Sequence, residues 1–582
     1  MVSKTLSLTS AAVVSALLAF TTPQVEAQGI AGAYLGAKQA EARGDIGEAA
    51  RLYAETLARD PQNDGVMERA MIHQIAAGLV PDGIALARRY EELKPGHHLG
   101  VLALATDALR KGNFAKAREI LGDGGTFVGQ IMAAWAAFGE EDVDAARAKL
   151  TALEATDENG PPGQIVAAYH LGLLEAAAGN DLAATEAYQR TADLANGGTL
   201  RLAELHARAL ARLDRKDDAI AVINDRLSGT YGNIGLTQLS EEIAAGGEPS
   251  LMVASADQGA AEVLFGVSGL LARGRNRLIA LAYSRLAVHL AADLTEAKLL
   301  IAQILDQDRQ YELAVSAYDA IPDTAPEALN ARIGKAEALQ ADEKVDDGIA
   351  MMKATISAYP DALEAHTALG DMLRRESRFE EASAAYDGAV RLLGKIEPHH
   401  WALFYQRGIT FERSKKWDQA EADFRKALEL NPDQPEVLNY LGYSLVEFGQ
   451  KLDEAERMIE KAVEQRPEDG YIVDSLGWIL YRFGEFDRAL VHLERAVELR
   501  PVDPVINDHF GDALWMVGRQ IEARFQWKRA LSFEPEDKDA TRIRRKLDVG
   551  LDIVLDEERE QGLPGIIGRN GTSDGETDKD GG

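Results

Sequence analysis

Four prolines recur at nearly constant intervals in the last third of the chain: Pro432, Pro467, Pro501 and Pro535. The intervals between them are 35, 34 and 34 residues. Because a proline cannot continue a helix, a proline at a fixed interval marks the end of a helical unit that repeats. Periods of this length are typical of arrays of two-helix units. The chain therefore has to be considered as a repeat array before any single site is sought in it.

The stretch from Asp469 to Pro501 shows what one unit contains. Apolar and small residues follow helical spacing in its first half at Val473, Leu476, Gly477 and Leu480. They do so again in its second half at Phe486, Ala489, Leu490, Leu493, Ala496 and Val497. Gly477 and Ala489 are small where two packed helices would cross at about 8–10 Å. Gly484 suits the end of the first helix, so the stretch predicts a helical hairpin.

The same skeleton recurs on both sides of this hairpin. One unit holds Gly408, Trp417, Ala420, Phe424, Ala427 and Pro432, the next Gly442, Gly449, Ala455, Ala462 and Pro467, and the last Gly511, Gly518, Ala523, Trp527, Ala530 and Pro535. These residues resemble the tetratricopeptide repeat family. More degenerate units such as "GDIGEAARLYAETLARDP" extend the resemblance over nearly the whole chain after residue 27, to roughly a dozen units. The repeats are strongest at 401–535.

The resemblance implies an all-α fold, a right-handed α-solenoid of stacked hairpins, because one hairpin cannot bury its own apolar face. We expect a degenerate N-terminal lobe at 28–227 and a C-terminal lobe at 260–537. Glycines and small polar residues predict an irregular insertion between the lobes at 228–259. The charged segment 538–563 is predicted to be a capping helix, and the acidic, glycine-rich tail 564–582 to be disordered.

The N-terminus has the composition of a signal peptide. Lys4 precedes an apolar run from Ala11 to Phe20, and Val25 and Ala27 are small residues at a cleavage site before Gln28. The run is short for a bilayer span, and no later segment has about 18 unbroken apolar residues. We therefore predict that residues 1–27 are cleaved and that the protein is exported to the periplasm, soluble or peripherally associated with the envelope. An uncleaved signal anchor is the alternative.

The charge and the cysteine content exclude several classes of function. Lys and Arg number 63 against 94 Asp and Glu, which gives a net charge of -31. Such a surface repels phosphate backbones, so nucleic acid is not the expected partner. The chain has no cysteine, which removes disulfides, thiolate metal sites and the lipid-modified cysteine of an exported lipoprotein.

No catalytic or cofactor motif stands out in the sequence. We find no phosphate-binding glycine loop, no G-x-S-x-G and no H-E-x-x-H. The pairs His97-His98 and His399-His400 are interpreted as surface histidines, because adjacent side chains on a helix point apart. Asn570 matches a glycosylation acceptor only weakly, in the predicted disordered tail. The prediction is a non-enzyme with no cofactor and no metal.

In the tetratricopeptide family the first helix of each pair lines a concave groove. The corresponding places in this chain predict a partner-binding groove at Tyr405, Asn439, Tyr443, Tyr471, Asp474, Trp478, Tyr481, Asp508, Asp512 and Trp515. Trp478 and Trp515 are the predicted anchors, whereas Trp417 and Trp527 fall at second-helix places and are assigned to the core. The alternative is that the groove aromatics only pack against neighbouring repeats. Aspartates in place of the basic residues that some relatives use to hold a peptide carboxylate favour a partner with apolar and basic side chains.

Together these features predict a non-catalytic scaffold or adaptor of the bacterial cell envelope. The layout is similar to that of envelope tetratricopeptide proteins that partner a carboxyl-terminal processing protease in cell-wall turnover. A different class remains open, a structural subunit of a secretion, pilus or polysaccharide-export assembly that uses its convex face. Self-association and the identity of the partner stay open as well.

Overall fold

The computed structural model describes residues 30–122, 125–156, 158, 160–228, 233–274, 276–561 and 565–567. The predicted signal peptide at 1–27 lies outside these residues, and so does the predicted tail at 564–582 except for Gly565–Ile567. Within the described ranges every regular element is a helix, which confirms an all-α repeat solenoid. Among the same residues, no helix has both the length and the apolar character that crossing a bilayer requires.

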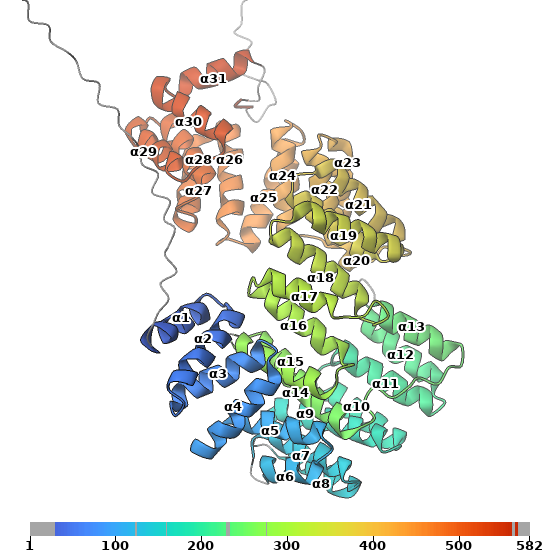
Figure 1. Ribbon diagram of the computed structural model, residues 1–582. Coiled ribbons are helices and arrows are strands. Elements are labelled where there is room, and N and C mark those ends of the chain that lie inside the picture. The colour runs from blue at the N-terminus through green and yellow to red at the C-terminus, as the bar shows by residue number, and fades with distance from the viewer. Residues whose placement is uncertain are drawn as a thin grey trace, which may run out of the picture. The chain divides into compact units, whose positions relative to one another are not determined.

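The helices form two compact units (Figure 1). The first comprises the chain up to Arg226 together with Leu239–Ala331. Its helices are α1 (Ile30–Ala42), α2 (Ile46–Arg59), α3 (Asp64–Ala76), α4 (Val80–Leu93), α5 (His98–Arg110), α6 (Phe114–Leu121), α7 (Phe127–Gly139), α8 (Val143–Ala155), α9 (Gly160–Ala177), α10 (Asp181–Leu194), α11 (Leu200–Arg212), α12 (Lys216–Leu227), α13 (Ile234–Ala244), α14 (Ala256–Ala272), α15 (Arg277–Leu290), α16 (Thr295–Gln307) and α17 (Tyr311–Asp319).

The second unit comprises Leu227–Gln238 and the chain from Arg332 onward. Its helices are α18 (Ala328–Ala341), α19 (Val345–Ala358), α20 (Leu363–Arg375), α21 (Phe379–Leu392), the 3-10 turn η1 (Pro398–His400), α22 (Trp401–Arg413), α23 (Trp417–Leu430), α24 (Pro435–Glu447), α25 (Leu452–Gln465), α26 (Gly470–Arg482), α27 (Phe486–Leu499), α28 (Pro504–Met516), α29 (Gln520–Leu531), α30 (Asp537–Val549) and α31 (Leu551–Glu560).

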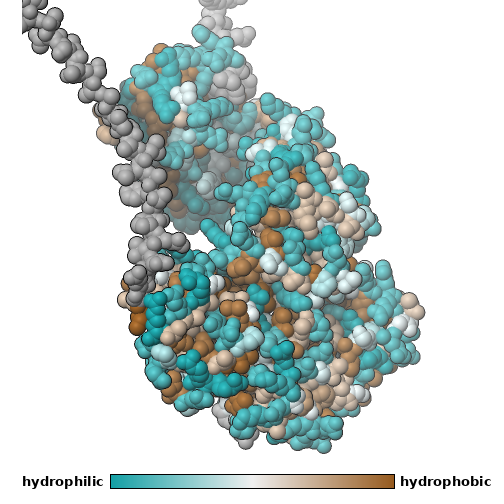
Figure 2. All heavy atoms as spheres, in the orientation of Figure 1, coloured by the Kyte–Doolittle hydropathy of each residue, from teal (hydrophilic) through white to brown (hydrophobic). Residues whose placement is uncertain are grey.

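In the four hairpins from α22 to α29, a glycine on the first helix lies where the two helices cross. A Cβ atom at Gly477 would lie 2.6 Å from Leu493 Cγ, and one at Gly408 would lie 2.7 Å from Phe424 Cε1. At these crossing points only a residue without a side chain lets the large residue of the second helix fill the space. Trp527 fills the same place opposite Gly511 and is fully buried, which confirms its assignment to the core. The opposite faces of the helices are polar, and on the face that Figure 2 shows hydrophobic side chains gather only in small areas.

In the first unit the chain turns back and covers its own first helices. After α13, α14 and α15 pack against α3, α5, α7 and α9 and lie in the middle of the unit (Figure 1). The close fit of α14 depends on Gly259, where a Cβ would overlap the buried indole of Trp135. On α15, Tyr283 Oη lies 2.9 Å from His98 Nδ1 of α5.

A buried ion pair also fixes α14. Arg201 of α11 donates from Nε and Nη2 to the two carboxylate oxygens of Glu262, both at 2.7 Å. Tyr169 of α9 donates to the same carboxylate at 2.7 Å. Burial alone would raise the pKa of Glu262, but Arg201 outweighs it and holds the pKa below its usual value. A charged residue therefore ties α14 to two helices of the N-terminal array.

Two boundaries differ from those predicted. The predicted lobes meet at 228–259, whereas α14 to α17 belong to the same compact unit as the N-terminal helices, which ends at Ala331. The insertion holds the short helix α13 in its described part. The predicted single capping helix at 538–563 is two helices, because Gly550 adopts φ 94° between α30 and α31.

We expect Gly259→Ala to lower the free energy of unfolding of the first unit by about 1–3 kcal/mol, because the added methyl overlaps Trp135 and must push α14 and α7 apart. The matched control is Gly266→Ala on the same helix, where a Cβ meets nothing within 4 Å. That exposed change should raise the stability by up to about 1 kcal/mol through helix propensity. Urea denaturation followed by hydrogen exchange of α7 and α14 measures both effects. Equal effects of the two substitutions would contradict this packing.

Candidate partner-binding surface

The ten predicted groove residues all lie on the first helices α22, α24, α26 and α28 of the second unit, but they divide into two sets. Four are half-buried: Tyr405, Asn439, Tyr443 and Trp478. Tyr471 is 51% exposed, with the guanidinium of Arg500 4.8 Å from its ring centroid. The other five are buried: Asp474, Tyr481, Asp508, Asp512 and Trp515. We call the four half-buried residues the open face.

The open face carries aromatic rings beside an unpaired amide. Asn439 precedes Tyr443 by one helical turn on α24, and Asn439 Oδ1 is buried with no hydrogen-bond partner among the described residues. Trp478 of α26 follows Tyr443 by one repeat period and stacks on His509 at 3.9 Å and on Tyr481 at 4.8 Å. Burial raises the pKa of Tyr405 to about 12 and that of Tyr443 further. These phenols stay protonated and offer apolar ring surface and neutral hydroxyls.

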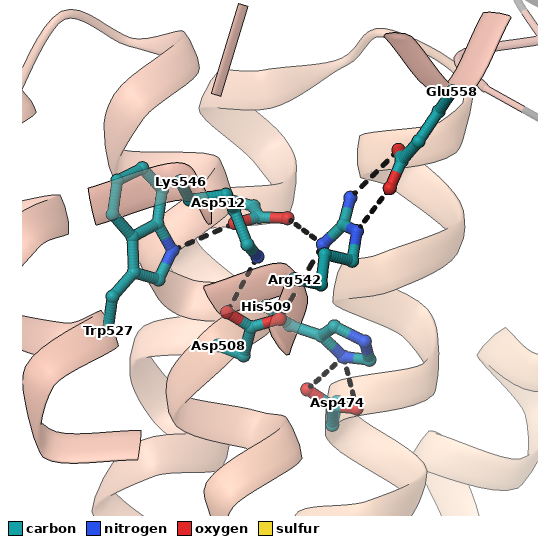
Figure 3. Close-up of polar contacts among 8 residues, drawn as sticks. All are labelled: Asp474, Asp508, His509, Asp512, Trp527, Arg542, Lys546 and Glu558. Atoms are coloured by element: carbon teal, nitrogen blue, oxygen red, sulfur yellow. Dashed lines mark hydrogen bonds and ion pairs between the residues drawn. The ribbon is translucent and has the colours of Figure 1, made fainter. Parts of the chain in front are cut away.

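The buried set belongs to a cluster of charged residues at the end of the array (Figure 3). Lys546 Nζ of α30 lies 2.6 Å from both Asp508 Oδ1 and Asp512 Oδ1. Arg542 of α30 reaches Asp512 Oδ2 at 3.0 Å and Glu558 of α31 at 2.6 Å. The Lys546 side chain is 0% exposed. Helices α26, α28, α30 and α31 are thus joined by charges enclosed in protein.

Aromatic and histidine side chains complete this cluster. Trp527 Nε1 donates to Asp512 Oδ1 at 2.9 Å, and His509 Nδ1 lies 3.0 Å from Asp474 Oδ2. Trp515, outside the figure, stacks on Trp527 at 5.3 Å and donates to Asp552 of α31 at 3.0 Å. Partners within the chain thus occupy Asp474, Asp508, Asp512 and Trp515, whereas the buried hydroxyl of Tyr481 has no hydrogen-bond partner among the described residues.

The pKa values of the aspartates and of His509 are shifted because several charged groups are buried close together. Burial acts to raise the pKa of Asp512, but Lys546 and Arg542 hold it below its usual value. For Asp508, burial raises the pKa and the nearby Asp512 reinforces the rise. Burial acts to lower the pKa of His509, but Asp474 more than offsets it, so the pKa lies above 6.5. Asp474 therefore favours the protonated form of His509.

The three aspartates and the anchor Trp515 that the sequence assigned to the groove are buried in this structure. The sequence analysis assigned 538–563 to a capping helix and did not single out Arg542 and Lys546. A signal was available, since Arg542 and Lys546 each stand 34 residues after Asp508 and Asp512. Opposite charges one period apart meet when consecutive first helices stack.

The histidines of the two pairs form contacts within the chain. His97 Nδ1 accepts the backbone N–H of Gly100 at 3.1 Å and so caps α5, and His98 contacts Tyr283. Of the second pair, His400 is buried and its Nδ1 accepts the N–H of Glu397 at 2.9 Å. In the part of the chain that the structure describes, no three His, Asp or Glu side chains are grouped so as to hold a metal ion.

Comparison with known families decides the assignment of the repeat. Family models of the tetratricopeptide repeat match residues 333–395, 401–434 and 448–504, all within the second unit. This is a tetratricopeptide repeat protein. No curated protein sequence matches the chain.

Several solved tetratricopeptide structures are similar to parts of this chain. The APC/C hetero-tetramer Cut9–Hcn1 has a TM-score of 0.36 and 14% identity, covering 84% of this chain and 96% of that chain. YrrB, described as a TPR protein with an unusual peptide-binding site, has a TM-score of 0.26 and 20% identity, covering 33% and 97%. MamA has a TM-score of 0.25 and 22% identity, covering 29% and 97%. At these TM-scores the similarities say nothing about what this protein binds.

We expect Lys546→Met to destabilise the second tetratricopeptide unit by about 3–5 kcal/mol, because it removes the fully buried cation of Asp508 and Asp512 and leaves them only Arg542. Lys538→Met is the matched control, since Lys538 lies exposed on the same helix; it should change stability by less than about 0.5 kcal/mol. Urea denaturation followed by the fluorescence of Trp515 and Trp527 reports the difference. A loss no larger than that of the control would show that the cluster does not hold α30 in place.

The His509 cation predicts a pH dependence with a defined sign. Its pKa is higher in the folded chain than 6.5, so its stabilisation is fully present below pH 6.5 and is lost as the pH rises through the folded value. The unfolding free energy of the native chain relative to His509→Gln should therefore fall from pH 6 to pH 9. When both proteins also carry Asp474→Asn, the difference between their unfolding free energies should not change from pH 6 to pH 9. A difference that grows with pH would contradict the ion pair.

Proposed function

We propose that this protein is a non-catalytic adaptor of the bacterial cell envelope that binds a partner protein through the open face of its second unit. Tetratricopeptide repeat proteins bind protein or peptide partners. The observation that carries the proposal is the buried, unpaired Asn439 Oδ1, one helical turn before Tyr443 on α24. A buried acceptor without a partner costs about 1–3 kcal/mol, and a donor from a bound main chain would relieve that cost.

The chemistry of the open face favours a partner with apolar and basic side chains. Aromatic rings that are already held by packing give contact area without a large loss of side-chain entropy. Carboxylates flank them, among them Glu436, which lies near Tyr405, and Glu447, which accepts from Trp478 Nε1 at 3.3 Å. With a net charge of -31 on the whole chain, approach of a basic segment is favoured over long range.

The proposed location rests on the sequence of residues 1–27, whose charged start, apolar run and small residues at 25 and 27 are those of an exported precursor. In the envelope the adaptor would support a protease or another cell-wall enzyme. A second candidate is a structural subunit of an envelope assembly. It is favoured by exposed apolar residues on the second helices, namely Val491, Ile521 and Phe525, which are 65%, 75% and 66% exposed.

Photo-crosslinking in intact cells tests the adaptor against the assembly subunit. With a benzophenone side chain at Tyr443, the chain should crosslink to one main partner, whereas the same side chain at Val491 should not. Mass spectrometry of the same material should find a mature N-terminus at Gln28. Crosslinks from position 491 alone would support the assembly subunit, and a retained Met1 would contradict cleavage.

A matched pair of amide deletions measures the contribution of the open face. Asn439→Ala should weaken capture of the crosslinked partner about tenfold or more, equivalent to about 1.4 kcal/mol, while leaving stability nearly unchanged because Oδ1 has no partner to lose. Gln526→Ala on α29 is the control, since Gln526 Oε1 is also buried without a partner but lies on a second helix. Equal capture by the two variants would rule out recognition at Asn439.

A further inference from the structure

A short segment after the last helix, Gly565–Ile567, lies against the C-terminal end of α26. The N–H of Ile567 donates to the carbonyl oxygen of Arg482 at 2.8 Å. The side chain of the same arginine donates from Nε to the carbonyl oxygen of Gly565 at 2.8 Å. Because the last four carbonyls of a helix have no partner within the helix, the Arg482 carbonyl is free to accept such a bond. One residue thus holds the main chain of an extended segment at two points.

The donor side of this contact is fixed before anything binds to it. The Arg482 side chain is 4% exposed, and its Nη1 pairs with Glu447 of α24 at 2.5 Å. Glu447 Oε1 also accepts from Trp478 Nε1 at 3.3 Å. Arg482 Nη2 has no hydrogen-bond partner in the described part of the chain. A buried, oriented guanidinium with a spare donor is a built site for carbonyl oxygens, since little side-chain entropy is lost when they bind.

The side chains of the segment add apolar contacts. Ile566 Cγ2 lies 3.7 Å from the place where Gly484 would carry a Cβ, so the isoleucine packs beside the turn that ends α26. Ile567 packs against the hydrophobic core of the C-terminal hairpins. Both isoleucines nevertheless stay only half-buried. The contact therefore selects an extended segment with two consecutive aliphatic residues, held chiefly by its main chain.

We propose that Arg482 is a main-chain clamp for an extended aliphatic segment of the partner protein, and that Gly565–Ile567 is its tethered competitor. The proposal rests on the proposed function and names the chemistry of the ligand. The partner segment offers a carbonyl at one residue, an N–H two residues later, and aliphatic side chains at the second and third positions. It runs from the clamp toward the open face, where Trp478 shares Glu447 with Arg482.

The short connection between α31 and Gly565–Ile567 explains why this segment occupies the clamp and can still be displaced by a partner. Only four residues separate Glu560, the end of α31, from Gly565, so the segment reaches the clamp at an effective concentration of the order of millimolar. Two hydrogen bonds and two half-buried side chains make a weak contact in themselves. A partner that adds contacts with Tyr443 and Trp478 displaces the segment, whereas an isolated aliphatic peptide does not.

A labelled peptide tests the clamp in the full-length chain. The probe is a fluorescent peptide with the sequence of residues 563–569, LPGIIGR, and the released protein carries Ile566→Asp and Ile567→Asp. We expect the peptide to bind the released protein at least about tenfold more tightly than the native protein. The same peptide methylated on the nitrogen that corresponds to Ile567 should not bind, because it lacks the donor to the Arg482 carbonyl.

Variants of the clamp separate it from a merely structural role. In the released protein, Arg482→Ala should abolish peptide binding. Arg413→Ala is the matched control, because Arg413 ends α22 as Arg482 ends α26, but its side chain is 61% exposed. If Arg482→Ala unfolds the unit, the methylated peptide still decides the question, since it changes no residue of the protein.

Equal peptide affinity of the native and released proteins would overturn the proposal, and so would full binding of the methylated peptide. A native protein that is a dimer and becomes a monomer when it carries the two Asp substitutions would also overturn it, because the segment would then contact a second copy of the chain. The benzophenone crosslink from position 443 reports the adaptor function separately. If the peptide tests fail but the crosslink from position 443 is still formed, only the clamp proposal is contradicted. If the crosslink is lost while the peptide binds as expected, only the adaptor function is contradicted.

Discussion

A helical hairpin leaves one apolar face that it cannot bury itself, and each part of this protein can be understood from what covers that face. Within a hairpin, the close approach of Gly477 to Leu493 brings the two helices together. Between hairpins, the next pair covers the exposed side. Where the succession of hairpins is interrupted or ends, other parts of the chain must bury the apolar face of the last hairpin. The two units meet this requirement with different interactions.

In the first unit the cover is apolar and close-fitting, with one buried ion pair. Trp135 of α7 packs on Gly259 of α14, and Arg201 pairs with Glu262. The later helices α14 and α15 thus cover the helices α3, α5, α7 and α9 of this unit.

At the end of the second unit the cover is charged. Burying Asp508 and Asp512 would be costly without Lys546 and Arg542, and the gain from the pairs roughly balances the cost of removing them from water. What the charges supply is register: sliding α30 along α28 by one turn would leave buried charges unpaired. The apolar residues of the array repeat from unit to unit and would tolerate such a shift better. The ion pairs therefore define where the array stops.

The local features of the fold could be predicted from the sequence because they repeat. The hairpins, the small residue at Gly477, the end of α26 at Gly484 and the buried place of Trp527 all follow from periodicity within about 34 residues. The return of α14 and α15 onto α3–α9 could not be predicted, since it joins residues more than a hundred positions apart and carries no periodic signal. The sequence places Tyr443 and Asp512 at equivalent positions of their first helices, yet Tyr443 is half-buried whereas Asp512 and the nearby Trp515 are buried. This difference could not be predicted, because the helices that cover Asp512 and Trp515 lie outside the repeats.

The surfaces left to a partner are those that neither kind of cover reaches. On α24 and α26 the open face adjoins the place where Gly565–Ile567 contacts Arg482, and Glu447 connects them by accepting from both Trp478 and Arg482. Since one carboxylate oxygen serves both donors, a ligand that draws the Trp478 indole away leaves Glu447 to Arg482 alone and strengthens that pair. The stacking of Trp478 on His509, whose protonated form Asp474 favours, extends the same set of contacts into the buried cluster. The open face and the buried cluster at the C-terminal end are therefore connected through shared side chains.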